Sequence, residues 1–326
     1  MGRLIRAVFP GGRILDATPV AAAAPLSRLK LFFALSRTPH GLLDLATPAL
    51  GALLWLGGLP SPGVAALGLL TAFAGYTAVY ALNDLVDYRA DRKKIQGGGF
   101  QECENYLDAA LVRHPLAQGW LSLKEGLFWA GGWALVALVG AYLLNPVCAA
   151  IFLAGCLLET IYCLLLSVSH LRTLVSGVVK TLGAMAAVYA VDPAPSPLFL
   201  LLLFLWLFFW EIGGQNIPAD WHDLEADRLS QAQTLPVRYG PGRAASISWG
   251  CLGLSVALSP LVLWLSPAGV PLSLVAAGLG CGIYLLLLPG WRLYRTRARA
   301  QASALFNQAS YYPLAMLLVI LAGFMS

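Results

Sequence analysis

The sequence predicts an all-α membrane protein with nine membrane-spanning helices. Three observations lead to this class. Hydrophobic residues make up 59% of the 326 residues and charged residues only 11%, which is too little charge to cover a water-soluble domain of this size. Apolar stretches of about 18 residues or more recur along the whole chain. The basic residues are confined to one side of the map that these stretches define.

Nine apolar stretches are long enough to cross a bilayer, and short segments rich in Pro and Gly separate several neighbours. The predicted spans cover approximately residues 41–59, 62–82, 126–144, 146–166, 172–191, 196–215, 245–265, 268–289 and 308–325.

The distribution of charge predicts the topology. Of the 21 Lys and Arg residues, none falls in the loops on the opposite side from the N-terminus. The positive-inside rule therefore places the N-terminus and the long loops 83–125 and 216–244 in the cytoplasm, and we expect a multi-pass protein of the plasma (inner) membrane, in contact with membrane lipids. The net charge of +5 follows from this topology, so we expect no nucleic-acid partner.

The chain divides into two parts. Residues 1–36 form a cytoplasmic N-terminal segment, in which the stretch Ser27–Ser36 favours an amphipathic helix at the membrane interface. Residues 37–326 form the transmembrane domain.

Two acidic clusters have the same spacing, D-x-x-D-x-x-x-D, and each follows a predicted span at its cytoplasmic end. Positions i, i+3 and i+7 share one face of a helix, so each cluster is expected to present three carboxylates in a row. An Asn precedes each cluster, at positions 83 and 216. The carboxylates are those of Asp84, Asp87 and Asp91 in the first cluster and of Asp220, Asp223 and Asp227 in the second.

A row of like charges near the bilayer is costly, because the carboxylates repel one another and lose solvation. A divalent cation removes both costs, and Mg²⁺ typically takes one or two carboxylates and leaves other positions to water and substrate phosphate. One cluster alone is explained equally well as helix capping or a solvated loop. Two clusters of identical spacing on one side of the membrane favour a shared site for metal and diphosphate.

These residues resemble the UbiA-type intramembrane prenyltransferase superfamily, whose motifs follow the second and sixth spans. Arg37 to Gly41, His114 to Gly119 and Thr234 to Gly240 also resemble short segments of that family, in the same order along the chain. The resemblance covers residues 37–326 and implies nine transmembrane helices in a bundle around a central cavity.

The resemblance also implies an activity, namely Mg²⁺-dependent transfer of a prenyl group from an isoprenoid diphosphate donor to an aromatic or other lipophilic acceptor. By resemblance, Asp84, Asp87, Asp91, Asp223 and Asp227 would be the Mg²⁺ ligands, and the repeated spacing adds Asp220. We expect Asp84, Asp87, Asp223, Asp227 and Lys180, a charge inside the fifth span, to act in catalysis. The implied substrate-binding residues are Asn83, Arg113, His114, Tyr162, Arg172, Asn216 and Arg228.

The chain departs from the family pattern in its cations. The basic pair at the end of the fourth span is replaced by Leu166 and Ser167, and His114 stands where the family has Arg. The chain also has an extra segment at about 95–111. The cations expected to substitute at the diphosphate are those of Lys180, Arg172, Arg113 and Arg228.

Further groups lie inside the predicted spans. Asp44, Glu159 and Glu211 are candidates for contact with the acceptor, because an ionisable side chain exposed to lipid is costly. Aromatic residues are expected near the cavity, although for any single one core packing or an interfacial position is the favoured role. These residues are Tyr76, Tyr80, Tyr162, Tyr189, Trp206 and Trp210.

Three other functions use the same features. A terpene cyclase of this fold would need the aspartates but no acceptor. A phosphoribosyl transferase acting on a lipid phosphate would keep the metals with a more polar cavity. A transporter or a lipid- or diphosphate-binding protein would also have intramembrane charges and internal repeats, but it would not consume the diphosphate.

Overall fold

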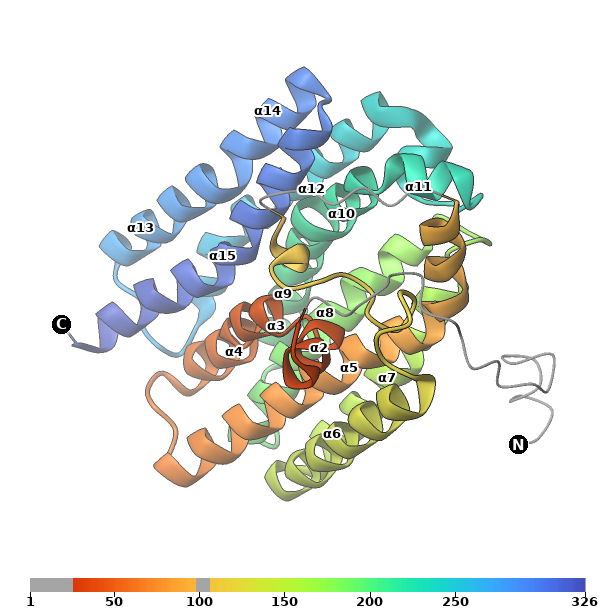
Figure 1. Ribbon diagram of the computed structural model, residues 1–326. Helices are drawn as coiled ribbons and strands as arrows, with labels where there is room; N and C mark the ends of the chain where they lie inside the picture. The colour runs from red at the N-terminus through yellow and green to blue at the C-terminus, as the bar shows by residue number, and fades with distance from the viewer. Residues whose placement is uncertain (1–25, 98–105, 326) are drawn as a thin grey trace.

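The computed structural model of the chain describes residues 26–97 and 106–325, and this part is almost entirely helical, with no strand. Figure 1 shows the long helices running roughly parallel, with α13–α15 on one side of the bundle and α5–α7 on the other. The predicted class, an all-α membrane protein, is thereby confirmed. In chain order the described helices are α2 (Arg28–Leu35), α3 (Thr38–Asp44), α4 (Ala46–Leu56), α5 (Pro62–Gln96), η1 (Leu107–Ala109), α6 (Leu123–Leu144), α7 (Pro146–Leu164), α8 (Arg172–Val191), α9 (Pro197–Trp210), η2 (Glu211–Asn216), α10 (Ile217–His222), α11 (Leu224–Leu229), α12 (Leu235–Leu265), α13 (Leu272–Gly282), η3 (Ile283–Leu287), α14 (Leu288–Thr296) and α15 (Arg299–Met325).

Among these residues, eight helical segments are long and apolar enough to cross a membrane. The first predicted span, 41–59, is not one continuous helix but is divided into α3 and α4 at Leu45. Pro48 has no N–H to donate to the carbonyl of Asp44, and that carbonyl instead accepts the hydroxyl of Thr47 at 2.8 Å. The break therefore follows from one residue, and α3 and α4 together take the place of the expected first span.

Helix α5 is much longer than the span predicted at 62–82. Its 35 residues correspond to about 52 Å at 1.5 Å per residue, well beyond the ~30 Å of a hydrocarbon core. The first aspartate motif therefore lies on a helical extension of the span rather than in a loop. Ser61 begins the helix by accepting a hydrogen bond from the N–H of Val64.

The second motif lies on a less regular backbone. After α9 the chain forms a π-helical segment, η2, and then the short helices α10 and α11, which meet at Asp223 (φ −94°, ψ 12°). Pro218 lacks the N–H that would bond to the carbonyl of Gly214, which favours the wider π turn before it. The expectation that Asp220, Asp223 and Asp227 share the face of one continuous helix is therefore wrong.

The main apolar core lies in the C-terminal half, where α9 and α12–α15 pack together with α4 and α8. Its largest fully buried side chains include Trp206, Trp210 and Tyr312. Trp206 donates to the hydroxyl of Tyr312 at 3.1 Å, and Trp210 donates to the carbonyl of Ala309 at 2.9 Å. The two tryptophans thus belong to the core between α9 and α15, and they do not line the cavity described below.

The segment before the first span contains a helix, α2, close to the stretch where one was predicted. Leu31 and Leu35 of this helix are fully buried against residues of α5 and α6, so α2 is packed on the domain. A position for α2 at the membrane interface remains a prediction.

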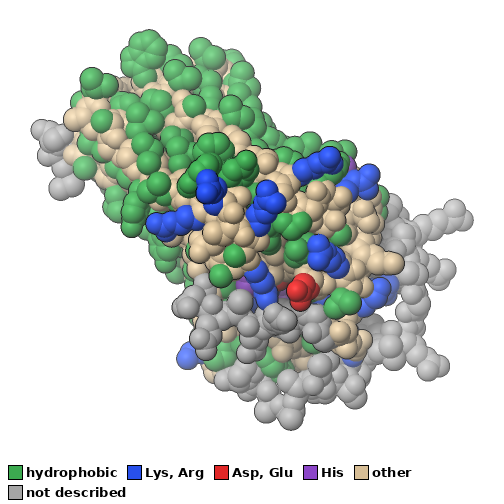
Figure 2. All heavy atoms as spheres, turned by 90° about the horizontal axis from the view of Figure 1, so that it is seen from above, with side chains coloured by type: hydrophobic (Ala, Val, Ile, Leu, Met, Phe, Trp, Pro, Cys, Tyr) green, Lys and Arg blue, Asp and Glu red, His purple; other side chains and the backbone are tan. Residues whose placement is uncertain are grey.

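The surface of the molecule separates by residue type. Figure 2 shows Lys and Arg side chains gathered on the end of the bundle where α11 and α14 terminate, whereas hydrophobic side chains cover the neighbouring flank. Large apolar side chains such as Phe128, Trp264 and Leu272 are 83%, 77% and 83% exposed, which is the pattern of a surface that faces lipid.

Candidate active site

Both aspartate motifs line one polar pocket of about 100 Å³ near the basic end of the bundle. Helix α5 contributes Asp87 and Asp91, and the α10–α11 segment contributes Asp220, Asp223 and Asp227. The sixth aspartate, Asp84, is buried beside the pocket. The tertiary structure therefore brings together two motifs that are separated by more than a hundred residues in the sequence.

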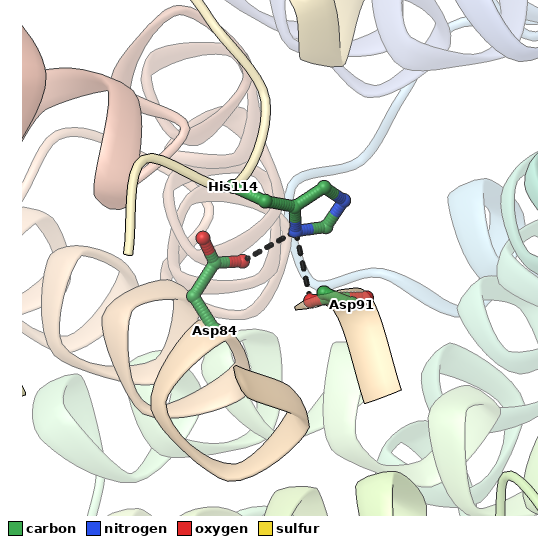
Figure 3. Close-up of side chains that lie close together, drawn as sticks. All are labelled: Asp84, Asp91 and His114. Carbon is green, nitrogen blue, oxygen red and sulfur yellow. Dashed lines mark ion pairs between the residues drawn. The ribbon is translucent and has the colours of Figure 1, made fainter. Parts of the chain in front are cut away.

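The first motif meets a histidine from the segment before α6. Figure 3 shows His114 between Asp84 and Asp91, with Nδ1 at 2.9 Å from Asp91 Oδ2 and 3.4 Å from Asp84 Oδ1. One atom from each of the three residues lies within 4.8 Å of the others, which is close enough to share a metal ion. Burial alone would lower the pKa of His114, but the two carboxylates outweigh it and raise that pKa to about 9.

Each aspartate of the second motif is paired with a basic side chain from another element. Arg172 of α8 lies 2.9 Å from Asp220, and Lys94 of α5 lies 2.7 Å from Asp227. Arg113 donates two hydrogen bonds to Asp223, at 2.9 and 2.6 Å, in the bidentate arrangement typical of strong Arg–carboxylate pairs.

The pKa values of Asp223 and Asp227, which lie outside the spans, are shifted in opposite directions although both basic partners lower them. Burial on its own would raise the pKa of Asp223, but Arg113 holds that pKa well below its usual range. Burial also raises the pKa of Asp227, and Lys94 offsets only part of that rise. The two pKa shifts differ in direction because Arg113 donates two hydrogen bonds to Asp223, whereas Lys94 makes a single contact with Asp227.

The pocket lining fits a hard divalent cation. It contains six carboxylates against four Lys or Arg side chains and His114, so its cations do not outnumber its acidic groups. Two buried oxygens of the second segment, Asp220 Oδ2 and Asn216 Oδ1, have no hydrogen-bond partner within the described residues. Carboxylate and amide oxygens of this kind are the ligands that Mg²⁺ prefers.

Four predicted substrate-binding residues, Asn83, Tyr162, Asn216 and Arg172, lie close to where this pocket meets a second, larger cavity. Asn83 donates to Glu159 at 2.7 Å and accepts from Arg37 at 3.1 Å. Asn216 donates to the hydroxyl of Tyr162 at 3.1 Å, and the guanidinium of Arg172 lies 3.9 Å from the centre of the Tyr162 ring. Arg172 therefore contacts both Asp220 and the aromatic ring at the mouth of the larger cavity.

The larger cavity has a volume of about 430 Å³ and a mainly apolar lining. It shares Arg37, Asn83, Asp108 and Tyr162 with the polar pocket and extends along α4, α5 and α8 to the far ends of these helices. Tyr76, Tyr80, Tyr162 and Tyr189 were the tyrosines expected near a cavity; the first three line it, and Tyr189 is absent from its lining.

Two of the cations predicted to bind diphosphate lie elsewhere. Lys180 lies deeper in the large cavity, where its Nζ is 2.6 Å from Asp44 and 2.9 Å from the hydroxyl of Tyr80. Arg228 is exposed and does not line the polar pocket, because it follows Asp227 directly on α11 and projects from a different side of the helix.

Several residues of the pocket were not singled out from the sequence. Lys94 follows Asp91 by three positions on α5, so helical spacing alone could have identified it. Asp108 lies in the extra segment, 2.5 Å from His40 and 3.3 Å from Arg37. Burial would raise the pKa of Asp108, but His40 and Arg37 hold it well below its usual range.

No sequence signal marks Asp108, because its position depends on contacts made around it. The N–H of Leu107 donates to Asn307 of α15 at 2.9 Å, and Tyr106 stacks on His222 with ring centres 4.1 Å apart. These contacts hold the described end of the extra segment, whose residues 98–105 lie outside the described part, against the second motif.

The fold and the site together define a multi-pass integral membrane protein with an acidic, polar pocket that opens onto an apolar cavity. The sequence matches the model of the UbiA prenyltransferase family over residues 45–320, and the chain belongs to that family. The family resemblance predicted from the motifs is thereby confirmed. No curated protein sequence matches the chain.

Solved structures have the same fold. The structure of a UbiA homologue from Aeropyrum pernix K1 superimposes with a TM-score of 0.67 at 20% identity, covering 88% of this chain and 97% of the other. The structure of digeranylgeranylglyceryl phosphate synthase gives 0.64 at 19% identity, covering 92% and 100%. A UbiA homologue from Archaeoglobus fulgidus, bound to GPP and Mg²⁺, gives 0.62 at 19% identity, covering 91% and 100%.

Proposed function

We propose that this protein transfers a prenyl group from an isoprenoid diphosphate to an aromatic or other lipophilic acceptor within the membrane, and that the reaction depends on Mg²⁺. One observation carries the proposal: both aspartate motifs converge on a polar pocket that opens onto an apolar cavity. Membership of the family supports it. So do relatives of the same fold bound to DMAPP or GPP together with Mg²⁺.

The polar pocket would hold the metal and the diphosphate. Asp84, Asp87, Asp91, Asp220, Asp223 and Asp227 are the proposed ligands, with Asn83 and Asn216 beside them. When bound, Mg²⁺ would neutralise charge on the diphosphate as the C–O bond of the donor breaks.

We propose that the basic side chains of the pocket act both in the site as the structure shows it and in the site with metal and diphosphate bound. In the structure, Arg113, Arg172 and Lys94 neutralise Asp223, Asp220 and Asp227. With these carboxylates holding a metal, the same three cations would be in place to donate to diphosphate oxygens. This arrangement would substitute for the basic pair that the family usually carries and that this chain lacks at Leu166 and Ser167.

The large cavity would hold the prenyl chain and protect the reacting carbon from water. Its apolar walls exclude water from the allylic cation. The Tyr162 ring lies at its mouth, where cation–π contact could stabilise the cation by about 0.5–2 kcal/mol. Lys180, the proposed catalytic cation that lines this cavity and not the polar pocket, would act near the acceptor.

The test is release of inorganic diphosphate by the purified protein in lipid nanodiscs. The substrates are dimethylallyl, geranyl and geranylgeranyl diphosphate, each with and without Mg²⁺. Asp84→Asn and Asp223→Asn should each lower the rate by at least ~100-fold, as expected for a loss of about 3 kcal/mol of transition-state stabilisation. Asp192→Asn is the matched control, because Asp192 follows α8 at the end of the helix opposite Arg172.

Unchanged turnover in both active-site variants would refute the assignment of the metal ligands. Consumption of the donor to a cyclised product without any acceptor would instead favour a terpene cyclase. Tight binding of the diphosphate without turnover would favour a transporter or binding protein.

We further propose that the protein lies in the plasma (inner) membrane with its N-terminus and polar pocket on the cytoplasmic side. The concentration of Lys and Arg on one end of the bundle supports this orientation. Labelling of single cysteines placed at each end of α8, with a reagent that cannot cross the membrane, would test it.

A further inference from the structure

One buried carboxylate of the large cavity has no place in the metal and diphosphate chemistry. Glu211 is only 6% exposed and lines the apolar cavity rather than the polar pocket. Its Oε1 accepts a hydrogen bond from Ser176 of α8 at 2.8 Å. Its Oε2 has no hydrogen-bond partner among the residues that the structure describes. A buried acceptor atom without a partner is costly, which indicates that a ligand fills the position.

The backbone directs Glu211 into the cavity. Glu211 is the first residue of the π-helical segment η2, and π turns inside helices are frequent at functional sites. The opposite side of this segment is held tightly. A Cβ atom added at Gly213 would lie 2.7 Å from the carbonyl oxygen of Ser248, and one added at Gly214 would lie 2.8 Å from the Cβ of Ala309. Close packing on one side therefore leaves Glu211 and Gln215 on the cavity side.

The charges around Glu211 indicate what kind of group it receives. Lys180 lines the same cavity, but its ammonium already contacts Asp44 at 2.6 Å and Tyr80 at 2.9 Å. Arg37 is shared between Asp84 and Asp108 at the pocket end. His40, the third basic side chain of the described lining, lies 2.5 Å from Asp108. Glu211 and Ser176 thus offer oxygen atoms in a cavity whose basic side chains already contact other acidic groups.

The separation from the metal site suits an acceptor. Glu211 precedes Asp220 by nine residues, across η2 and part of α10, and lines the apolar cavity whereas Asp220 lines the polar pocket. A diphosphate in the pocket and an acceptor beside Glu211 would therefore occupy neighbouring parts of the site. Asn216, between the two, lines the cavity and donates to Tyr162, which lines both the cavity and the pocket.

We propose that Ser176 and Glu211 bind the acceptor, that its reacting group is an uncharged hydroxyl of a phenol or alcohol, and that Glu211 takes the proton it loses. This inference rests on the proposed prenyl transfer. The bond between the prenyl carbon and the diphosphate oxygen breaks, and the diphosphate leaves with the electron pair. The new bond forms to the acceptor oxygen or to the ring carbon that the hydroxyl activates. In either case the acceptor loses one proton, which passes to Glu211.

The same arrangement disfavours acceptors with a carboxylate or phosphate at this position. Such a group would lie beside Glu211 in a mainly apolar cavity, and like charges in a low-dielectric site repel strongly. The site would therefore select uncharged acceptors over anionic lipids by their charge and not by their size.

The experiment compares two pairs of acceptors with the full-length protein in nanodiscs, supplied with Mg²⁺ and geranylgeranyl diphosphate. One pair is a long-chain 4-alkylphenol and the same phenol with a ring carboxylate. The other is a glycerol monoalkyl ether and its phosphate ester. The uncharged member of at least one pair should be prenylated about 100-fold faster than its anionic partner.

The variant Glu211→Gln should lower transfer to the uncharged acceptor by about 100-fold, as expected for loss of a general base. It should also lower the ratio of the transfer rates to the uncharged and the anionic acceptor by about 10-fold, because the amide of Gln carries no charge. Binding of geranylgeranyl diphosphate with Mg²⁺ should change less than about 3-fold. Glu225→Gln makes the same chemical change at an exposed position and should leave transfer at the wild-type rate.

Preference for the anionic acceptors, or full activity and selectivity in Glu211→Gln, would overturn this assignment while prenyl transfer itself stands. Prenylation of none of the four acceptors, despite diphosphate release, would overturn it too. Absence of both donor binding and diphosphate release would instead reject the proposed function, and this inference with it. If Glu211→Gln does not fold, the acceptor pairs tested on the wild-type protein still decide.

Discussion

The variant Lys180→Met tests whether the ion pair inside the large cavity is structural, catalytic or both. Lys180 and Asp44 are 13% and 3% exposed at their side chains, and their atoms lie 2.6 Å apart. Removing one partner of a buried pair leaves an uncompensated charge, at a cost of about 3–5 kcal/mol. The hydroxyl of Tyr80 still donates to Asp44 at 2.5 Å, so we expect the lower end of that range, about 3 kcal/mol.

This loss of stability converts to a measurable shift. For a chain of this size about 1 kcal/mol corresponds to roughly 2 °C, so the melting temperature of Lys180→Met in detergent should fall by about 6 °C. The double variant Lys180→Met/Asp44→Asn removes the uncompensated carboxylate as well and should recover most of that loss. The assay is thermal unfolding followed by tryptophan fluorescence, with prenyl transfer measured on the same preparations.

The two readouts separate the roles. If Lys180 is only structural, the double variant regains activity together with stability. If Lys180 also acts on the substrate, activity stays low in the double variant although its melting temperature is restored. A melting temperature of Lys180→Met within 1–2 °C of wild type, estimated from the same scale, would refute the reasoning that the ammonium compensates a buried carboxylate.

Two further perturbations follow from the site. The pKa of His114 is raised to about 9 by Asp91 and Asp84, so its stabilising charge is fully present below pH ~6.5 and is lost as the pH rises through about 9. In metal-free buffer the melting temperature should therefore fall across this range by the equivalent of up to about 3 kcal/mol, and a flat profile, matching that of His114→Gln, would contradict the assignment. Gly213→Ala places a Cβ 2.7 Å from the carbonyl oxygen of Ser248 and should cost about 1–3 kcal/mol while displacing η2 and lowering transfer. Gly250→Ala, where the structure leaves open space, is the control, and equal melting temperatures of the two variants would show that η2 is not tightly packed.

Helix spacing explains why much of the site was visible in the sequence. Asp84, Asp87 and Asp91 lie on one continuous helix, so their separations along the chain determine how they face one another. The same spacing in the second motif gave the correct residues for the pocket but the wrong local backbone. The reason is that Pro218 and the break at Asp223 interrupt the regular helix.

The partners of these aspartates were only partly visible. Arg113 and Arg172 were expected to act as cations at the site, whereas their contacts with Asp223 and Asp220 span 110 and 48 positions of sequence. Lys180 was expected near the diphosphate, but helix packing pairs it with Asp44, 136 positions away. Which cation meets which carboxylate is decided by how the helices pack, and no local pattern records it.

The sequence by itself determined the membrane class, the approximate spans, the side on which the charges gather and the two acidic motifs. Each of these depends on hydropathy or on helical spacing over fewer than about forty residues, and such short-range patterns can be read directly. The tertiary structure alone decided that the polar pocket joins the apolar cavity. It also decided that Asp108 enters the site and that Glu211 lines the cavity with one oxygen that no described residue hydrogen-bonds. These features arise from contacts between distant helices, whose energies are set by packing and burial rather than by neighbours in the chain.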